Sequence, residues 1–110
     1  MSNEFYLSRG YTPQVKSVTI SGLSTIKVWT PAAGKRVVVT NVSISSNAAG
    51  TIAFYFEGND RIAQFFRQGS ATINPHIGSW ESTTVAGGIF AKVNTSETDG
   101  VYVNLEGFEM

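Results

Sequence analysis

The sequence has no cysteine and only one histidine, His76, in its 110 residues. Without cysteine no disulfide and no thiolate metal site can form, so a disulfide-stapled secreted module is excluded. A single histidine also falls short of the ligand set that structural or catalytic zinc requires. We therefore expect no metal and no cofactor.

Charge is also scarce. Charged residues make up 15% of the chain, with 8 basic and 8 acidic side chains and a net charge of zero, whereas soluble domains usually carry about 25%. The only basic doublet is Lys35–Arg36, so we expect no nucleic-acid partner. Ser, Thr, Asn and Gly take the place of charge, and a surface of this kind is buried against other chains at low desolvation cost. The composition favours assembly.

Long apolar runs are absent as well. No stretch approaches the roughly 20 apolar residues that span a bilayer, and the residues after Met1 do not resemble a signal peptide. We expect no membrane segment and cytoplasmic synthesis. A mass of 11.8 kDa fits one domain.

Alternation of apolar and polar residues fills most of the chain, and no window shows the 3.6-residue period of a helix. Turn residues separate these runs at intervals of about ten residues, which is typical of all-β domains. We therefore predict an all-β, single-domain antiparallel β-sandwich or barrel with about seven or eight strands over residues 15–110. The stretch 67–87 is divided by Gly and Pro, which leaves an eight-stranded jelly roll and a seven-stranded immunoglobulin-like sandwich both open.

The same alternation assigns side chains to faces. We predict that Val38, Val42 and Ile44 point inward from one strand, together with Thr40. In "TIKVW" we predict that Trp29 lies opposite the face formed by Ile26 and Val28. Further inward-facing sets are expected in three later strands: Ile52, Phe54 and Phe56; Ile89, Ala91 and Val93; Val101, Val103 and Leu105.

Residues 1–14 show no period and are interpreted as an extended N-terminal arm. Disordered tails are usually poor in aromatic residues, whereas this segment carries Phe5, Tyr6 and Tyr11. We expect these three side chains to dock on a neighbouring subunit. Trp29 and Trp80 are second candidates for such contacts, because tryptophan is enriched at interfaces.

Motifs for catalysis are missing. His76 in "NPHIG" has no nucleophile motif beside it, and the "EGND" of residues 57–60 predicts a hairpin turn rather than a calcium loop. No pair of carboxylates is singled out for glycoside hydrolysis. We expect no catalytic residues and a protein that is not an enzyme. Tyr55 and Tyr102, opposite the apolar faces of their strands, suit stacking on sugar rings, but the favoured interpretation is that they cover the second face of the sandwich or pack at a subunit interface.

The segment "TPAAGKRVVVTNVSISSNAAGTIAFYFEG", followed later by "GGIFA" and "DGVYVNLEGFE", resembles small virion structural proteins of tailed phages. The resemblance covers roughly residues 15–107 and consists of turns and strands, with no catalytic motif. It implies a jelly-roll-like β-sandwich that often assembles as a trimer, in capsid decoration (cement) proteins or in tail and fibre components. The sequence departs from the pattern in the aromatic arm and in residues 67–87.

The resemblance leads to an expected function. We expect a phage virion protein of the capsid-decoration type, which binds and stabilises the major capsid lattice without catalysis. Its expected partners are the major capsid protein or another virion protein, with a homotrimer as its oligomeric state and the virion as its location. The alternative is a carbohydrate- or receptor-binding module of a phage tail tip or fibre.

Overall fold

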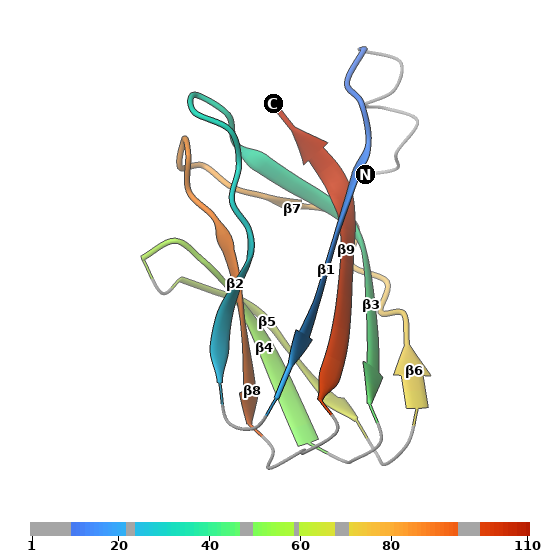
Figure 1. The fold of residues 1–110 in the computed structure, drawn as a ribbon. Helices are drawn as coiled ribbons and strands as arrows, with labels where there is room; N and C mark the ends of the chain where they lie inside the picture. Colours follow the sequence, from blue (N-terminus) through green and yellow to red (C-terminus); the bar gives the residue numbers. More distant parts are fainter. Residues whose placement is uncertain (1–9, 22–23, 47–49, 59, 68–70, 95–99) are drawn as a thin grey trace.

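The computed structural model describes residues 10–21, 24–46, 50–58, 60–67, 71–94 and 100–110. These residues form nine strands in two antiparallel sheets that pack as a sandwich (Figure 1), so the predicted all-β fold is confirmed. The strands are β1 (Gln14–Ile20), β2 (Thr25–Trp29), β3 (Val37–Ser46), β4 (Gly50–Phe56), β5 (Asp60–Arg67), β6 (Ala71–Ile73), β7 (Trp80–Glu81), β8 (Ile89–Asn94) and β9 (Val101–Glu109).

The strands pair as a nested set that joins the first strand to the last. β1 pairs with β9, β2 with β8, β3 with β6 and β7, and β4 with β5. Rolling such a ribbon places alternate pairs in opposite sheets, and the observed orders are β1–β9–β3–β6 and β2–β8–β4–β5. This is the jelly-roll arrangement with its two Greek keys, not the immunoglobulin-like one.

The stretch that sequence patterns left unclear holds one interrupted strand of this jelly roll. β6 pairs with β3 at Ile44–Ser46, and β7 pairs with β3 at Val38 and Val39. Residues 74–79 leave the sheet between these two short strands. Pro75 lies in this excursion, where the missing N–H of proline breaks no ladder.

The two sheets enclose an apolar core. The inward-facing sets predicted on β8 and β9 are fully buried, as are Ile52 and Phe54 on β4. The ring centroid of Trp80 lies 5.2 Å from that of Phe54 and 6.2 Å from that of Phe65. The buried core residues are Ile20, Trp29, Val37, Val39, Val42, Ile44, Ile52, Phe54, Trp80, Ile89, Ala91, Val93, Val101, Val103 and Leu105.

A bulge in β2 corrects the predicted position of Trp29. The pairing of β2 with β8 shifts register between Lys27 and Trp29, which makes Val28 an extra residue. One extra residue reverses the face that the next side chain occupies. Trp29 is consequently 0% exposed and belongs to the core, so the prediction that it lies opposite Ile26 and Val28 is wrong.

A second bulge, in β3, adds Thr40 to the strand. Val39 and Val42 face the core on either side of it, whereas Val38 faces the outer side of the sheet and packs with Phe108. The prediction that Val38 points inward is wrong, because the extra residue reverses the alternation.

Gly107 allows β9 to approach this bulge. A Cβ at Gly107 would lie 1.9 Å from the carbonyl oxygen of Val38, and backbone on both strands cannot yield to it. Gly107→Ala is therefore expected to lower the free energy of unfolding by at least about 3 kcal/mol, measured by denaturant titration of tryptophan fluorescence. Exposed Lys92→Ala is the control and should change it by less than about 0.5 kcal/mol. Equal stability of the two variants would contradict the close approach.

Candidate functional site

The structure describes three of the five predicted contact residues: Tyr11, Trp29 and Trp80. Phe5 and Tyr6 lie outside the described residues. Trp29 is 0% exposed and Trp80 is 8% exposed, so both tryptophans are core residues and neither ring lies on the surface of the chain. The bulge at Val28 turns Trp29 inward, and the stacking of Trp80 on Phe65 holds its ring between the sheets.

Tyr11 packs on its own chain. Together with Met110 it lies against Val38 and Phe108, two side chains that point outward from β3 and β9. Phe108 is 0% exposed despite facing outward. The segment that leads from the arm into β1 is therefore part of the folded sandwich, at the end that also holds the C-terminus (Figure 1). We call this end the C-terminal end.

Glu109 joins the two sheets at the C-terminal end. Its carboxylate accepts a hydrogen bond from Nε1 of Trp29 at 2.9 Å and another from the backbone N–H of Ala32 at 2.9 Å. The Nζ atom of Lys16, on the neighbouring edge of the sandwich, lies 5.8 Å from the Trp29 ring centroid. The buried indole N–H thus donates to a charged acceptor, and hydrogen bonds to charged acceptors are stronger than those to neutral ones.

These contacts lower the pKa of Glu109 below the ordinary carboxyl value of 4.5. Partial burial raises the pKa, but the hydrogen bonds from Trp29 and Ala32 and the positive charges of Lys16 and Lys35 outweigh it. Glu109 is ionised at neutral pH, and its structural role uses both oxygens.

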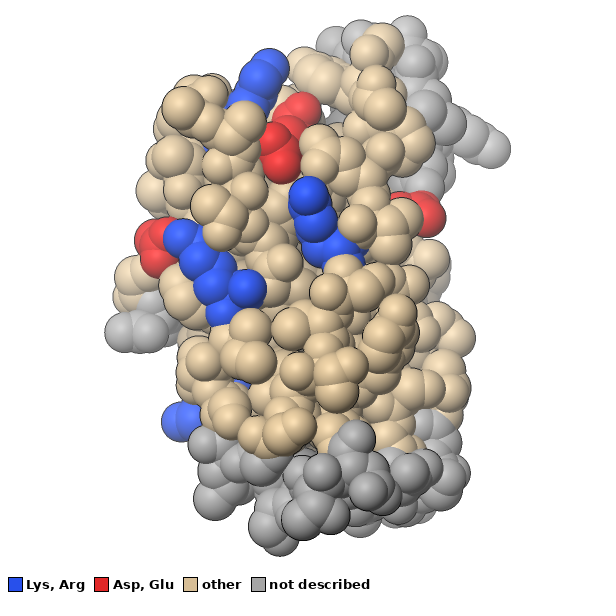
Figure 2. All heavy atoms as spheres, viewed as in Figure 1, with Lys and Arg blue, Asp and Glu red and all other residues tan. Residues whose placement is uncertain are grey.

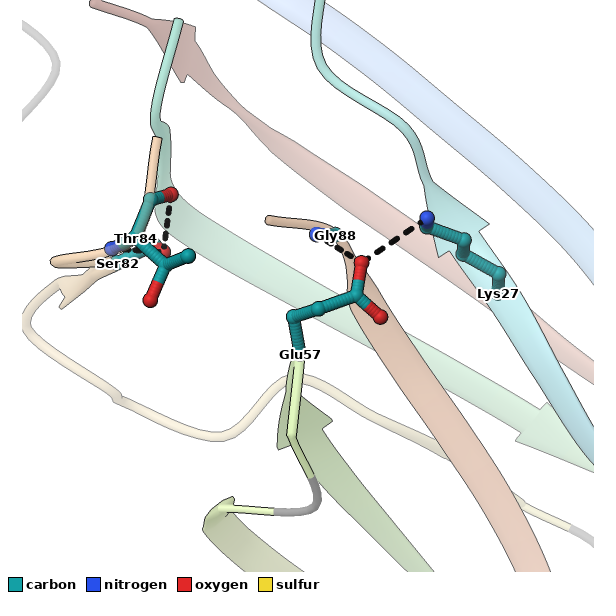
Figure 3. A network of polar contacts seen from close by, with 5 residues as sticks. All are labelled: Lys27, Glu57, Ser82, Thr84 and Gly88. Carbon is teal, nitrogen blue, oxygen red and sulfur yellow. Dashed lines mark hydrogen bonds and ion pairs between the residues drawn. The ribbon is translucent and has the colours of Figure 1, made fainter. Parts of the chain in front are cut away.

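Glu57 connects β4 with the edges of β2 and β8. Its Oε1 atom lies 3.1 Å from Nζ of Lys27 and accepts the backbone N–H of Gly88 at 3.3 Å (Figure 3). The Lys27 contact is the main reason for the lowered pKa of Glu57, and the Gly88 bond adds to it. A Cβ at Gly88 would meet the Lys27 side chain and the carbonyl oxygen of Trp29, so glycine is required for this arrangement.

The outer side of the β1–β9–β3–β6 sheet carries a group of uncharged polar side chains. Ser17 on β1 and Ser43 on β3 flank Asn104 on β9, and Oγ of Ser17 donates to Oδ1 of Asn104. Further along the sheet, Tyr102 is 47% exposed. We call this group the neutral face; its members are Ser17, Thr19, Ser43, Ser45, Thr72, Tyr102 and Asn104.

Most charged side chains of the described residues lie elsewhere. In the view of Figure 2 they gather toward the C-terminal end and along the β2 side, and a broad area over the lower parts of β1 and β9 shows none. On the other sheet, Lys27, Arg61 and Lys92 are exposed, and Nζ of Lys27 lies 5.5 Å from the Phe90 ring centroid. In the part of the chain that the structure describes, most charged side chains therefore lie away from the neutral face.

The other residues considered for catalysis or metal binding lie in or beside loops and turns. His76 is exposed in the excursion between β6 and β7. Asp60 begins β5 after the turn at Gly58, whose φ is +90°; Asn59 is outside the described residues. Within the described ranges, no three His, Cys, Asp or Glu side chains group as metal ligands. No helix in this part of the chain is long and apolar enough to cross a membrane.

Sequence reasoning found Tyr102 but missed the residues around it. Ser17 and Asn104 are separated by 87 positions in the chain, and only the pairing of the first strand with the last brings them together. Outward-facing positions are readable from alternation, but their neighbours across strands are not. Glu109 was missed because nothing in the local sequence signals its contact with Trp29.

Comparison with protein-family models gives no match, and comparison with curated protein sequences gives none either. Solved structures do match. The coat protein of tobacco streak virus has a TM-score of 0.53 and 6% identity, over 89% of this chain and 84% of that chain.

Two further solved structures, one from a phage capsid and one from a xylanase, are also similar to this chain. A chain of the cyanophage Pam1 capsid asymmetric unit has a TM-score of 0.47 and 16% identity, over 89% of this chain and 85% of that chain. The CBM36-1 domain of a multidomain xylanase, from the hindgut metagenome of Trinervitermes trinervoides, has a TM-score of 0.45 and 9% identity. The match covers 89% of this chain and 95% of that domain. At these identities the likeness to the coat protein establishes a shared fold and nothing further.

The Glu109 contact predicts a pH dependence of stability. Because the pKa of Glu109 is lowered in the folded state, its contribution is fully present above the ordinary carboxyl pKa and is lost as the pH falls through the folded-state pKa. In Glu109→Gln one oxygen serves two N–H donors, so unfolding free energy at pH 7 should fall by about 1–2 kcal/mol.

The measurement is denaturant unfolding of the parent and of Glu109→Gln between about pH 7 and about pH 3. The two stabilities should converge toward the acid end. Glu57→Gln, at an exposed ion pair, is the matched control and should have the smaller effect at pH 7. A constant difference between parent and Glu109→Gln over the whole range would rule out an ionised Glu109 as its source.

Proposed function

We propose that this protein is a structural component of a phage virion, of the capsid-decoration type. In this proposal it is synthesised in the host cytoplasm, binds the major capsid protein or another virion protein, stabilises the lattice and catalyses no reaction. The observation that supports the proposal best is the anchoring of the aromatic arm by Tyr11 on a jelly-roll sandwich.

Anchoring gives the arm a defined starting point. Tyr11 and Met110 cover Val38 and Phe108, so the described chain enters the sandwich at its C-terminal end. Phe5 and Tyr6 lie in residues 1–9. Aromatic side chains supply large contact areas with few rotatable bonds, which suits them to attach a small domain to a repeated surface.

Repetition strengthens such attachment. A short aromatic segment contributes a few kcal/mol before association costs are subtracted, and linking several copies raises the effective affinity. The trimer implied by the sequence resemblance supplies that multiplicity. The jelly roll shared with the tobacco streak virus coat protein is compatible with a virion part, while the proposed role itself depends on the arm.

The arm is tested by two deletions. Removal of residues 1–9 should leave the thermal midpoint unchanged and abolish cosedimentation with shells assembled from the capsid protein of the same virus. Removal of residues 1–12 should also lower the midpoint, by about 4–8 °C, because Phe108 loses the cover of Tyr11. Shells that still carry the protein lacking residues 1–9 would contradict the proposal.

The trimer is tested by light scattering behind a size-exclusion column. The full chain should elute with three times the mass of its 11.8 kDa protomer. The matched control is the Phe5→Ser, Tyr6→Ser double variant. Because it changes only the arm, it separates formation of the trimer from attachment to the shell. A monomer at every concentration would remove the trimer from the proposal.

A further inference from the structure

Tyr102 lies partly exposed on the neutral face. Of the aromatic side chains that the structure describes it is the most exposed, at 47%. Its partners across the sheet are Thr19 on β1 and Ser45 on β3. Both are small, so they reach only the base of the ring and leave its upper part open to solvent.

Hydroxyl and amide groups surround the ring in two rows. Oγ of Ser45 shares a hydrogen bond with Oγ1 of Thr72 on β6, and Oγ of Ser17 donates to Asn104. A hydroxyl that donates to one neighbour still accepts from another, and an amide has both kinds of group. Such a set matches a ligand whose own polar groups are hydroxyls.

The geometry points to a binding site for a neutral saccharide on the neutral face. The Tyr102 ring stacks on the C–H face of one sugar unit, and Thr19, Ser45 and Asn104 exchange hydrogen bonds with the sugar hydroxyls. A ring that anchors an apolar surface and a few polar groups that fix orientation are the usual division of roles in ligand sites. This inference goes beyond the proposed function, because saccharide binding requires no shell.

Charge distinguishes a neutral saccharide from an acidic one. On the outer side of β9 the charged residue is Glu106, four positions from Tyr102, or about 13 Å along a strand. No Lys or Arg is a member of the neutral face. A carboxylate, sulfate or phosphate on the ligand would lose its hydration without gaining a cation there.

Area distinguishes a small ligand from a second protein. At about 4.8 Å between strands and 3.3 Å per residue, two rows across four strands cover roughly 250 Å². A specific protein interface usually buries about 800 Å² per partner. The neutral face therefore suits a short oligosaccharide better than a second copy of this chain.

The test is a titration of the full-length, isotope-labelled protein with neutral trisaccharides of glucose, galactose, mannose and N-acetylglucosamine, followed by amide NMR shifts. Trigalacturonate is the acidic comparator. At least one neutral trisaccharide should shift Thr19, Ser45, Tyr102 and Asn104, with an affinity of about 1 mM. Tyr102→Ala should weaken binding at least about tenfold, whereas Tyr102→Phe, which keeps the ring, should bind within about twofold of the parent.

Tyr55→Ala on the other sheet is the matched control and should bind as the parent does. The thermal midpoint of Tyr102→Ala should equal that of the parent, since the side chain is exposed. The inference is overturned if no neutral trisaccharide shifts these residues at 10 times the expected dissociation constant, about 10 mM, if only trigalacturonate binds, or if the shifts arise from self-association that Tyr102→Ala abolishes. Loss of shell attachment in the arm deletion has no bearing on this result, so the two proposals fail separately.

Discussion

The close approach of β9 to β3 at Gly107 governs the C-terminal end of the molecule. A Cβ there would lie 1.9 Å from the Val38 carbonyl oxygen, so only glycine permits the bulge at Thr40. The bulge turns Val38 outward, where Val38 and Phe108 together form the surface against which Tyr11 packs. The next residue on β9, Glu109, then points between the sheets and binds Trp29. One backbone contact thus fixes both the arm anchor and the carboxylate that joins the sheets.

The pairing of the first strand with the last has the corresponding role at the other end. β9 lies between β1 and β3, which surrounds Tyr102 and Asn104 with small side chains from both neighbours. Antiparallel register then aligns Ser17, Asn104 and Ser43 in one row. Cross-strand neighbours decide the character of a sheet surface more than the sequence of any one strand does. The neutral face is therefore a product of topology.

Sequence patterns predicted the fold class and most of the core, because period-two alternation is a local property. Ile89, Ala91 and Val93 were placed correctly in this way. Trp29 and Val38 were placed wrongly because each follows or precedes a bulge, and a bulge is set by contacts with another strand. The candidate site likewise depends partly on local alternation and partly on contacts between distant strands. The exposure of Tyr102 was readable from β9 alone, while its companions and the Glu109 contact needed the long-range pairing.

The few charged side chains that the structure describes have definite positions and roles in the sandwich. Charged side chains join the two sheets at the C-terminal end, through Glu109 with Lys16 and Lys35 nearby. At the edge of β2, the exposed Lys27–Glu57 pair connects parts of a single sheet. Tyr102 and Glu109 are seven positions apart on one strand, or about 23 Å. An arm that attaches the domain by its C-terminal end therefore leaves the neutral face directed away from the attachment point. In the two proposals taken together, that face binds a neutral ligand weakly while the arm supplies the attachment, because desolvating hydroxyls and amides costs far less than desolvating charges.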